Sequence, residues 1–219
     1  MRCIRVWFKK IGLLRFVSHL DTMRCMTRAV RRADIPLWYT EGFNPHPYLN
    51  FPAPMPLGVE GVREPMDMRI EGEISDGEII ERLNAQLPPG FRIIEITEPI
   101  HKTNELAFAK YIIKADDEPG LYDKIAEAMS SGELKCEKPG KQRGRKTMKT
   151  VDISAGLSDY SINKENNEII LDVTLPCSNE SNINPINLMS AVKAYTNENI
   201  LPVSMIRYGL LISDKSDFR

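Results

Sequence analysis

Two spacings of hydrophobic positions, one typical of strands and one typical of helices, follow one another along the first hundred residues. Residues 2–10 carry apolar side chains at every second position with basic residues between them, which predicts a half-buried strand. Residues 19–33 repeat apolar positions every three or four residues, which predicts an amphipathic helix capped by Ser18. The same periods recur as strands over 66–74 and 91–97 and a helix over 75–87. With the extended segment 37–58, this order is typical of a ferredoxin-like β-α-β-β-α-β unit.

The second half repeats this order without repeating the sequence. The predicted elements are a strand over 109–115, a helix over 119–132, two strands over 151–163 and 168–176, a helix from 184, and a strand over 203–212. We therefore predict an α+β protein of two tandem ferredoxin-like units, 1–104 and 105–219. Each unit leaves one sheet face to cover, so the two are expected to pack together.

The first helix separates apolar from basic residues. At about 100° per residue, one side carries Leu20, Met23, Met26, Thr27 and Val30. The opposite side carries Arg24, Arg28, Arg31 and Arg32, with Asp21 as the one nearby acid. This stripe is interpreted either as an ordinary solvated face or as a set of phosphate-binding guanidinium groups.

Charge is distributed in blocks, although the net charge is only −1. Residues 1–36 hold nine bases against two acids, and residues 60–100 hold ten acids against four bases. Blocks of one sign predict separated surfaces, and a basic surface favours a polyanionic partner.

A second basic block occupies the predicted loop 135–150. It holds seven bases against Glu137, and its proline and glycines predict a mobile loop or a loose hairpin. It is interpreted either as a solubilising loop or as a clamp on a nucleic-acid backbone that gains affinity through counterion release. The clamp residues would be Lys138, Lys141, Arg143, Arg145 and Lys146.

The segment "EGFNPHPYLNFPAPMPLG", 41–58, combines five prolines with large apolar residues. Prolines keep the chain extended and lower the entropy lost when it becomes ordered. The segment is either a packed crossover or a stiff lip of a binding groove, where aromatic rings stack on bases. In the second interpretation the groove is lined by Tyr39, Phe43, Asn44, His46 and Tyr48.

Catalytic chemistry has one candidate set, His19, Asp21 and His46, which could supply a general base, a carboxylate and a second imidazole. The same three residues could equally supply part of the ligand set of a metal ion. Nothing in their spacing requires the side chains to meet, and we assign no metal. His19 is also interpreted as a half-buried residue at a helix start. The four cysteines are well separated, so neither a local zinc signature nor the cysteine triplet of an iron–sulfur site is present.

Composition places the chain among ordinary globular proteins, with 42% hydrophobic and 27% charged residues. No window reaches the roughly 20 apolar residues of a membrane span. We expect no membrane association, a cytoplasmic location and reduced cysteines.

The segment 12–61 resembles the radical-SAM-linked family, an uncharacterised bacterial domain. The matching pieces are Arg15-Phe16, Ser18-His19-Leu20-Asp21, Arg28, Arg31-Arg32, 42–47 and 56–59, with weaker features at 83–93 and 150–154. The resemblance implies a partner, a radical-SAM protein that carries an iron–sulfur cluster and S-adenosylmethionine. This chain, which lacks the cluster-binding triplet, would be the accessory half without a cofactor of its own.

Three functions remain open from the sequence. The leading hypothesis is a non-catalytic RNA-binding module that acts with the radical-SAM enzyme in RNA or ribosome-related modification. Tandem ferredoxin-like units also occur in RNA-processing proteins of CRISPR systems, an analogy of fold order alone. The alternatives are a metal-independent endoribonuclease that uses His19 and His46, and a protein-docking domain whose acidic 60–100 face carries the contact.

Overall fold

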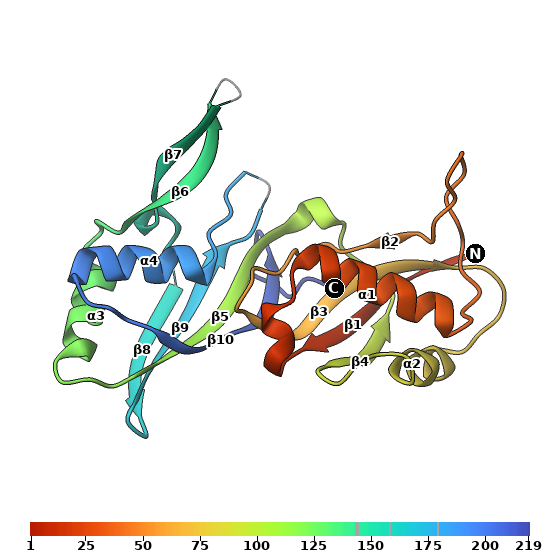
Figure 1. The fold of residues 1–219 in the computed structure, drawn as a ribbon, viewed down its shortest axis with the longest axis horizontal. Helices are drawn as coiled ribbons and strands as arrows, with labels where there is room; N and C mark the ends of the chain where they lie inside the picture. The colour runs from red at the N-terminus through yellow and green to blue at the C-terminus, as the bar shows by residue number, and fades with distance from the viewer. Residues whose placement is uncertain (143–144, 158, 179) are drawn as a thin grey trace. The chain divides into compact units, whose positions relative to one another are not determined.

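The computed structural model divides the chain into two compact units. Unit 1 comprises Met1–Leu106 and Arg207–Arg219, and unit 2 comprises Ala107–Ile206. The structure describes residues 1–142, 145–157, 159–178 and 180–219, with the backbone alone for 138–142 and 145–146. Figure 1 draws residues 1–106 of unit 1 in red to yellow-green, unit 2 in green to blue, and residues 207–219 of unit 1 in the darkest blue.

Unit 1 is a sheet with helices α1 and α2. Its elements are β1 (Arg2–Lys10), the 3-10 turn Gly12–Phe16, α1 (His19–Arg32), β2 (Leu49–Asn50), β3 (Glu60–Ile70), α2 (Asp76–Asn84), β4 (Phe91–Thr97) and the 3-10 turn Thr103–Glu105. The strand order begins β4-β1-β3-β10, and the short β2 pairs with β3. β1 is antiparallel to both β3 and β4, with Val6 opposite Met66 and Ile96.

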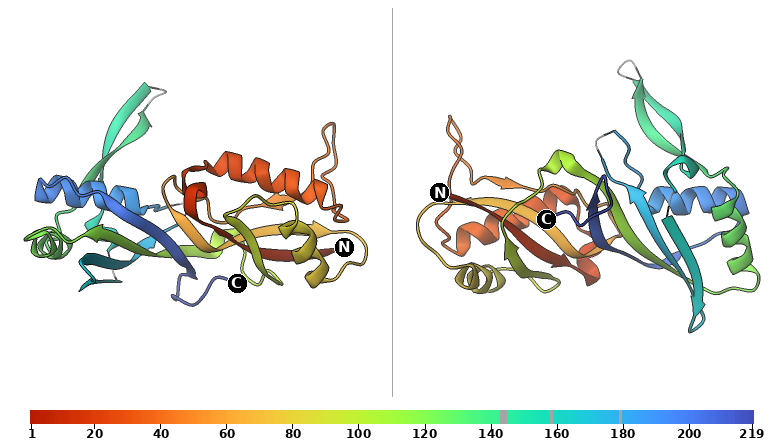
Figure 2. Two further views of the ribbon diagram at one scale, coloured as in Figure 1. Left: turned by 60° about the horizontal axis from the view of Figure 1, so that its bottom comes forward. Right: turned by 180° about the vertical axis from the view of Figure 1, so that it is seen from behind.

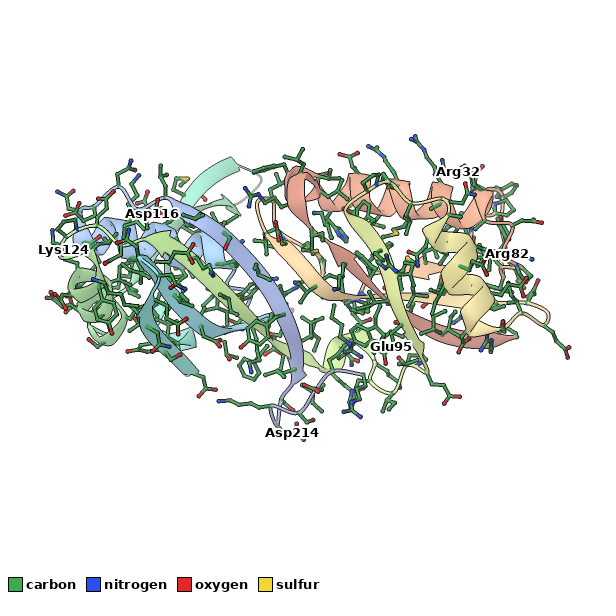
Figure 3. All side chains as sticks on the ribbon, turned by 90° about the horizontal axis from the view of Figure 1, so that it is seen from below. Arg32, Arg82, Glu95, Asp116, Lys124 and Asp214 are labelled. Atoms are coloured by element: carbon green, nitrogen blue, oxygen red, sulfur yellow. The ribbon has the colours of Figure 1, made fainter. Side chains whose placement is uncertain are left out.

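The core of unit 1 lies between this sheet and the two helices, which lie on the same side of the sheet (Figure 3). Alternate residues of β1, β3 and β4 face the helices because successive side chains in a strand point to opposite faces. The buried cluster joins Met26 and Val30 of α1 to Ile79 and Leu83 of α2. Its sheet residues are Ile4, Val6, Phe8, Met66, Met68, Ile70, Phe91 and Ile93.

The opposite face of β1 is also buried, which differs from the half-buried strand that the alternation predicts. Arg5 and Trp7 are each only 1% exposed. The Arg5 guanidinium donates to both carboxylate oxygens of Asp67, at 2.6 and 2.9 Å, and to the His101 carbonyl at 3.0 Å. It also lies 4.3 Å from the centroid of the Phe218 ring. Residues far along the chain therefore cover this face.

Unit 2 contains further strands of the same sheet order and a separate two-stranded hairpin. Its elements are β5 (Leu106–Asp116), α3 (Leu121–Ser130), β6 (Lys135–Gln142), β7 (Arg145–Asp152), the 3-10 turn Ser154–Gly156, β8 (Asp159–Glu165), β9 (Glu168–Pro176), α4 (Pro185–Thr196) and the first residues of β10 (Pro202–Ile212), which continues into unit 1 from Arg207. The strand order continues β10-β5-β9-β8, with β9 antiparallel to both β5 and β8. β6 and β7 pair only with each other (Figure 1).

The predicted fold class is confirmed at the level of a mixed α+β protein. The finer arrangement, two tandem ferredoxin-like units, stays a prediction. The structure assigns residues 207–219 to unit 1, whereas the division at 104/105 placed them in the second unit. The physical reason is that Arg207 pairs with Glu64 and Phe218 packs on Arg5, both in unit 1.

Residues 135–150 were predicted to form either a mobile loop or a loose hairpin. The structure shows a hairpin, in which β6 and β7 pair antiparallel. Residues 37–58 contain β2 as their regular strand, with isolated bridges at Leu37 and Tyr39 and with bends and a turn elsewhere. Among the helices of the described ranges, none is both long and apolar enough to span a bilayer.

Candidate nucleic-acid interface

Helix α1 begins at the sequence Ser-His-Leu-Asp because Ser18 caps it. The Ser18 hydroxyl accepts from the Asp21 backbone N–H at 3.1 Å and donates to the Asp21 carboxylate at 2.7 Å. This satisfies one of the backbone donors that a helix start leaves without a partner. The N-cap predicted at Ser18 is confirmed.

The buried face of α1 differs slightly from the predicted one. Met26 and Val30 are buried as expected, but Leu20 is 55% exposed. Thr22 and Ala29 complete the buried face, and neither has the hydrophobicity that would identify it from the sequence. Although the buried face differs from the predicted one, the arginines of α1 are still exposed.

An open cavity of about 630 Å³ lies along the exposed side of α1. It is lined by Asp21, Arg24, Cys25, Arg28, Arg32, Ala85, Gln86, Leu87 and Pro88. Arg24, Arg28 and Arg32 come from successive turns, about 6 Å apart along the helix axis. With three guanidinium groups against the one carboxylate of Asp21, the lining carries a net positive charge.

Two hydrogen bonds hold the C-terminal end of α1 against the end of α2. The Arg32 Nη2 donates to the Gln86 carbonyl at 3.0 Å, and the Arg82 Nη1 donates to the Asp34 carbonyl at 3.0 Å. Figure 3 labels Arg32 and Arg82 on the two helices. The cavity wall opposite the arginines is therefore fixed by the same contacts that hold the helices together.

The four arginines of the predicted stripe differ in their environment. Arg24 Nη1 lies 3.0 Å from Asp21 Oδ1 in an exposed ion pair. Among the described contacts, Arg28 has no partner, so its guanidinium is free to bind a ligand. Arg31 is exposed but does not line the cavity.

Two titratable groups in the cavity are unsuited to acid–base chemistry. Burial raises the pKa of the Cys25 thiol, and the nearby charges of Arg32 and Arg28 oppose this only in part. The Ser18 hydrogen bond lowers the pKa of Asp21, and the Arg24 hydrogen bond lowers it further. At neutral pH the first is a neutral thiol and the second an ionised helix-capping carboxylate.

The candidate catalytic set is not brought together by any described contact. The His19 ring packs edge-on against Phe51 with centroids 5.8 Å apart. His46 Nδ1 instead lies 3.1 Å from both Thr40 Oγ1 and the Asn44 carbonyl. His19 is the first residue of α1, whereas segment 40–47 rises beyond the C-terminal end of α1 (Figures 1 and 2).

His19 gives the stability of unit 1 a predictable dependence on pH. Burial lowers the pKa of His19, and the charges of Lys10 and Arg207 lower it further. The unfolded chain therefore binds the His19 proton more readily, and this contribution to stability is lost as pH falls from about 6.5 towards the folded pKa. We expect His19→Gln to lose less stability than the wild type between pH 7 and 5, measured by urea unfolding. Equal losses in both proteins would contradict this.

The predicted groove-lining segment lies outside the described cavity. Tyr39 forms an isolated bridge with Pro47, and the Phe43 side chain is fully exposed. Tyr48 packs edge-on against Trp38 with centroids 6.3 Å apart, and the Arg69 guanidinium lies 4.3 Å from the Tyr48 ring centroid. Asn44 contributes the carbonyl that contacts His46. The wall facing the arginines comes from 85–88 instead, which includes the first proline of the "PPG" that follows the helix predicted over 75–87.

The second basic block is placed only in part. Arg143 lies outside the described residues. For the remaining predicted clamp residues the structure describes the backbone in β6 and β7 and not the side chains: Lys138, Lys141, Arg145 and Lys146. The clamp therefore stays a prediction.

Within the described ranges, no group of three or more His, Cys, Asp or Glu side chains is placed to hold a metal ion. Within the same ranges, Cys3, Cys25, Cys136 and Cys177 form no disulfide.

These observations define a mixed α+β protein with an arginine-lined cavity on α1. Its fold is similar to that in the "Crystal Structure of a Cbf5-Nop10-Gar1 Complex", with a TM-score of 0.51 and 10% identity over 93% of this chain. Another similar structure is the "archaeal box H/ACA sRNP Nop10-Cbf5 complex", with a TM-score of 0.48 and 10% identity, again over 93% of this chain. The chain spans about half of the matched chains, 47% and 46% respectively. At 10% identity, the similarity to the first of these structures concerns the fold alone.

The family is established by sequence. Residues 3–185 match the family described as "Uncharacterized protein conserved in bacteria (DUF2344)", and the chain belongs to this family. The comparison with curated proteins gives no match. The link to a radical-SAM enzyme stays a prediction.

Proposed function

We propose that this protein binds single-stranded RNA through the arginine-lined cavity of α1. The observation that carries the proposal is the alignment of Arg24, Arg28 and Arg32 along one open cavity with a single carboxylate among them. Guanidinium groups bind phosphate through paired N–H donors, and an open cavity admits a chain rather than enclosing a small molecule. The clamp on β6–β7 would add further phosphate contacts.

The experiment that tests this proposal is a salt titration. Each phosphate contact to single-stranded RNA contributes about 0.7 to the fall of log affinity with log salt concentration. Three arginines therefore predict a slope of about −2 from α1 alone. We would measure fluorescence anisotropy of a labelled RNA oligomer between low and moderate salt. An affinity that does not change with salt would contradict the proposal.

We further propose that the protein is the accessory partner of a radical-SAM enzyme. Support comes from the resemblance carried by segment 12–61, and the partner would supply the iron–sulfur cluster and S-adenosylmethionine. RNA presented by α1 would then be the substrate on which the partner acts.

A pull-down separates this proposal from direct protein docking. The tagged chain is expected to retain the radical-SAM protein less well after nuclease treatment if RNA bridges the two. Retention that is unchanged by nuclease would instead support a protein-docking domain, and the acidic residues of 60–100 would be its first candidates. No retention in either condition would contradict the partnership.

We also infer that each unit is a variant of the ferredoxin-like fold. In support, unit 1 has the order β1-α1-β2-β3-α2-β4 with a very short β2. Unit 2 has the order β5-α3-β8-β9-α4-β10, with the β6–β7 hairpin inserted after α3. Both orders correspond to β-α-β-β-α-β.

A further inference from the structure

A second cavity, of about 540 Å³, lies in unit 1 on elements that the α1 site does not use. It is lined by Trp7, Arg63, Glu95, Thr97, Glu98, Ile100, Tyr208, Gly209, Leu210, Asp217 and Arg219. Trp7 and Thr97 belong to the face of the sheet opposite the core cluster, since their neighbours Val6, Phe8 and Ile96 pack towards the helices. The cavity therefore differs from the α1 site in position and in composition.

The floor of this cavity is a stacked pair of planar groups. The Arg63 guanidinium lies 3.6 Å from the centroid of the Trp7 ring. Two ties hold the stack in place. The Trp7 Nε1 donates to Thr97 Oγ1 at 2.9 Å, and Arg63 donates to Glu95 Oε2 from Nε at 3.3 Å and from Nη2 at 2.9 Å. The Arg63 side chain remains 36% exposed, so it presents a fixed flat surface.

The charge of the lining argues against a phosphate ligand. Three carboxylates, Glu95, Glu98 and Asp217, face two guanidinium groups, Arg63 and Arg219. Glu95 is engaged by Arg63, and Asp217 lies 3.9 Å from Arg219. Among the described contacts Glu98 has none, so its exposed carboxylate is the acceptor left for a ligand.

The ligand that matches these features is a planar, uncharged ring with adjacent N–H donors. We propose that this cavity binds a nucleobase of the RNA, with guanine preferred. The base stacks on the outer surface of Arg63, as bases stack on arginine planes in RNA-binding proteins. Glu98 accepts from the N–H groups on the pairing edge of guanine. Uracil has one N–H on that edge and satisfies the carboxylate only in part.

This inference rests on the proposed RNA binding, and the fold connects the two cavities. Residues 85–88 of the α1 cavity end two residues before β4 begins, and Glu95 and Thr97 of the second cavity belong to β4. β4 is the first strand of the order β4-β1-β3, so it is an edge strand of the sheet. An RNA strand with phosphates on α1 would cross this edge to place a base against Arg63.

The test compares the labelled RNA pentamers UUGUU, UUUUU and a UU–UU pentamer with an abasic central position. The wild type is expected to bind UUGUU about tenfold more tightly than UUUUU, because one well-placed pair of hydrogen bonds discriminates bases by about that factor or more. Glu98→Gln is expected to abolish this preference. Arg63→Ala is expected to bring UUGUU down to the affinity of the abasic pentamer. Glu73→Gln, an exposed carboxylate outside both cavities, is the matched control and should keep the wild-type ratio.

The ratio of affinities is the readout because removing a charge also changes overall RNA binding. Equal affinity of the wild type for UUGUU and UUUUU overturns the base-binding cavity, while a normal salt dependence for both leaves the α1 proposal standing. A preference that survives Glu98→Gln overturns the role of that carboxylate, even if Arg63→Ala fails to fold. A wild type that binds none of the pentamers contradicts the α1 proposal, and the cavity proposal falls with it.

Discussion

Simultaneous replacement of Arg24, Arg28 and Arg32 by alanine is expected to weaken binding of single-stranded RNA about 100-fold at about 0.1 M salt. The three side chains line one cavity from successive turns of α1. Each lost phosphate contact removes about 0.7 from the salt slope, which corresponds to about 0.7 log units of affinity between about 1 M and 0.1 M salt. The slope itself should therefore become shallower by about 2. Anisotropy titrations at several salt concentrations measure both quantities.

The helix provides its own control for this experiment. Arg31 is exposed on α1 but lies outside the cavity, so Arg31→Ala removes a charge without removing a lining group. We expect Arg31→Ala to change affinity several-fold less than Arg28→Ala, which removes the lining arginine that has no described partner. Unaltered RNA affinity in the triple variant, with a circular dichroism spectrum like the wild type, would reject α1 as the binding surface.

Replacement of Glu64 by alanine is expected to lower the free energy of unfolding by about 3–5 kcal/mol. Glu64 and Arg207 are each 1% exposed and form an ion pair in which Arg207 Nε donates at 2.9 Å. Arg207 also donates to the carbonyls of Ala53 at 2.7 Å and Pro54 at 3.3 Å. Without Glu64 these carbonyls cannot balance the buried positive charge.

A third buried charge increases the expected loss. Lys10 is fully buried, and its Nζ donates to the Val17 carbonyl at 2.7 Å. Burial lowers the pKa of Lys10, while the charge of Glu64 acts in the opposite direction. Removing Glu64 therefore takes the ion-pair partner from Arg207 and a compensating negative charge from Lys10. Gly61 belongs to the same arrangement, because a Cβ at this position would overlap the Glu64 side chain.

Urea unfolding followed by circular dichroism measures this loss. Glu78→Ala is the matched control, because Glu78 pairs with Arg82 at 2.6 Å with 41–45% of both side chains exposed, and such pairs contribute about 0–1 kcal/mol. The double variant Glu64→Met, Arg207→Met should recover part of the stability, since apolar residues of similar volume replace a buried pair well. If the Glu64→Ala protein were as stable as the Glu78→Ala protein, the Glu64–Arg207 pair would not be desolvated.

Local signals in the sequence predicted the helices well. The cap predicted at Ser18 is confirmed, and Ser75 and Asn184 cap α2 and α4 in the same way: each side chain accepts a backbone N–H three residues later. Pro185 occupies the first turn of α4, as its fixed backbone angle favours. Capping depends on residues within one turn, so the sequence contains everything needed to predict it.

The charge blocks were a less complete guide. The basic block 1–36 was expected to form a surface, but Arg5 and Lys10 are buried. Asp67, which pairs with Arg5, and Glu64, whose charge acts on Lys10, come from the acidic block 60–100, and these two carboxylates are buried as well. Some basic residues of 1–36 and some acidic residues of 60–100 therefore neutralise each other inside unit 1. Strand pairing between β1 and β3 brings them together, which composition alone does not reveal.

The candidate sites show the same division. The amphipathic period of 19–33 predicted which arginines would be exposed, because a helix fixes the direction of each side chain from its own sequence. The wall at 85–88 and the Trp7–Arg63 stack depend on contacts between residues that are distant in the chain, so the sequence did not predict them.

By itself, the sequence determined the helices, their caps, the mixed α+β class and the arginine stripe, since these follow from neighbours within a few residues. The tertiary structure decided which charges are buried, which elements enclose each cavity and that residues 207–219 belong to unit 1. The physical reason is that burial depends on what covers a side chain, and for β1 the cover comes from segments near residues 101 and 218.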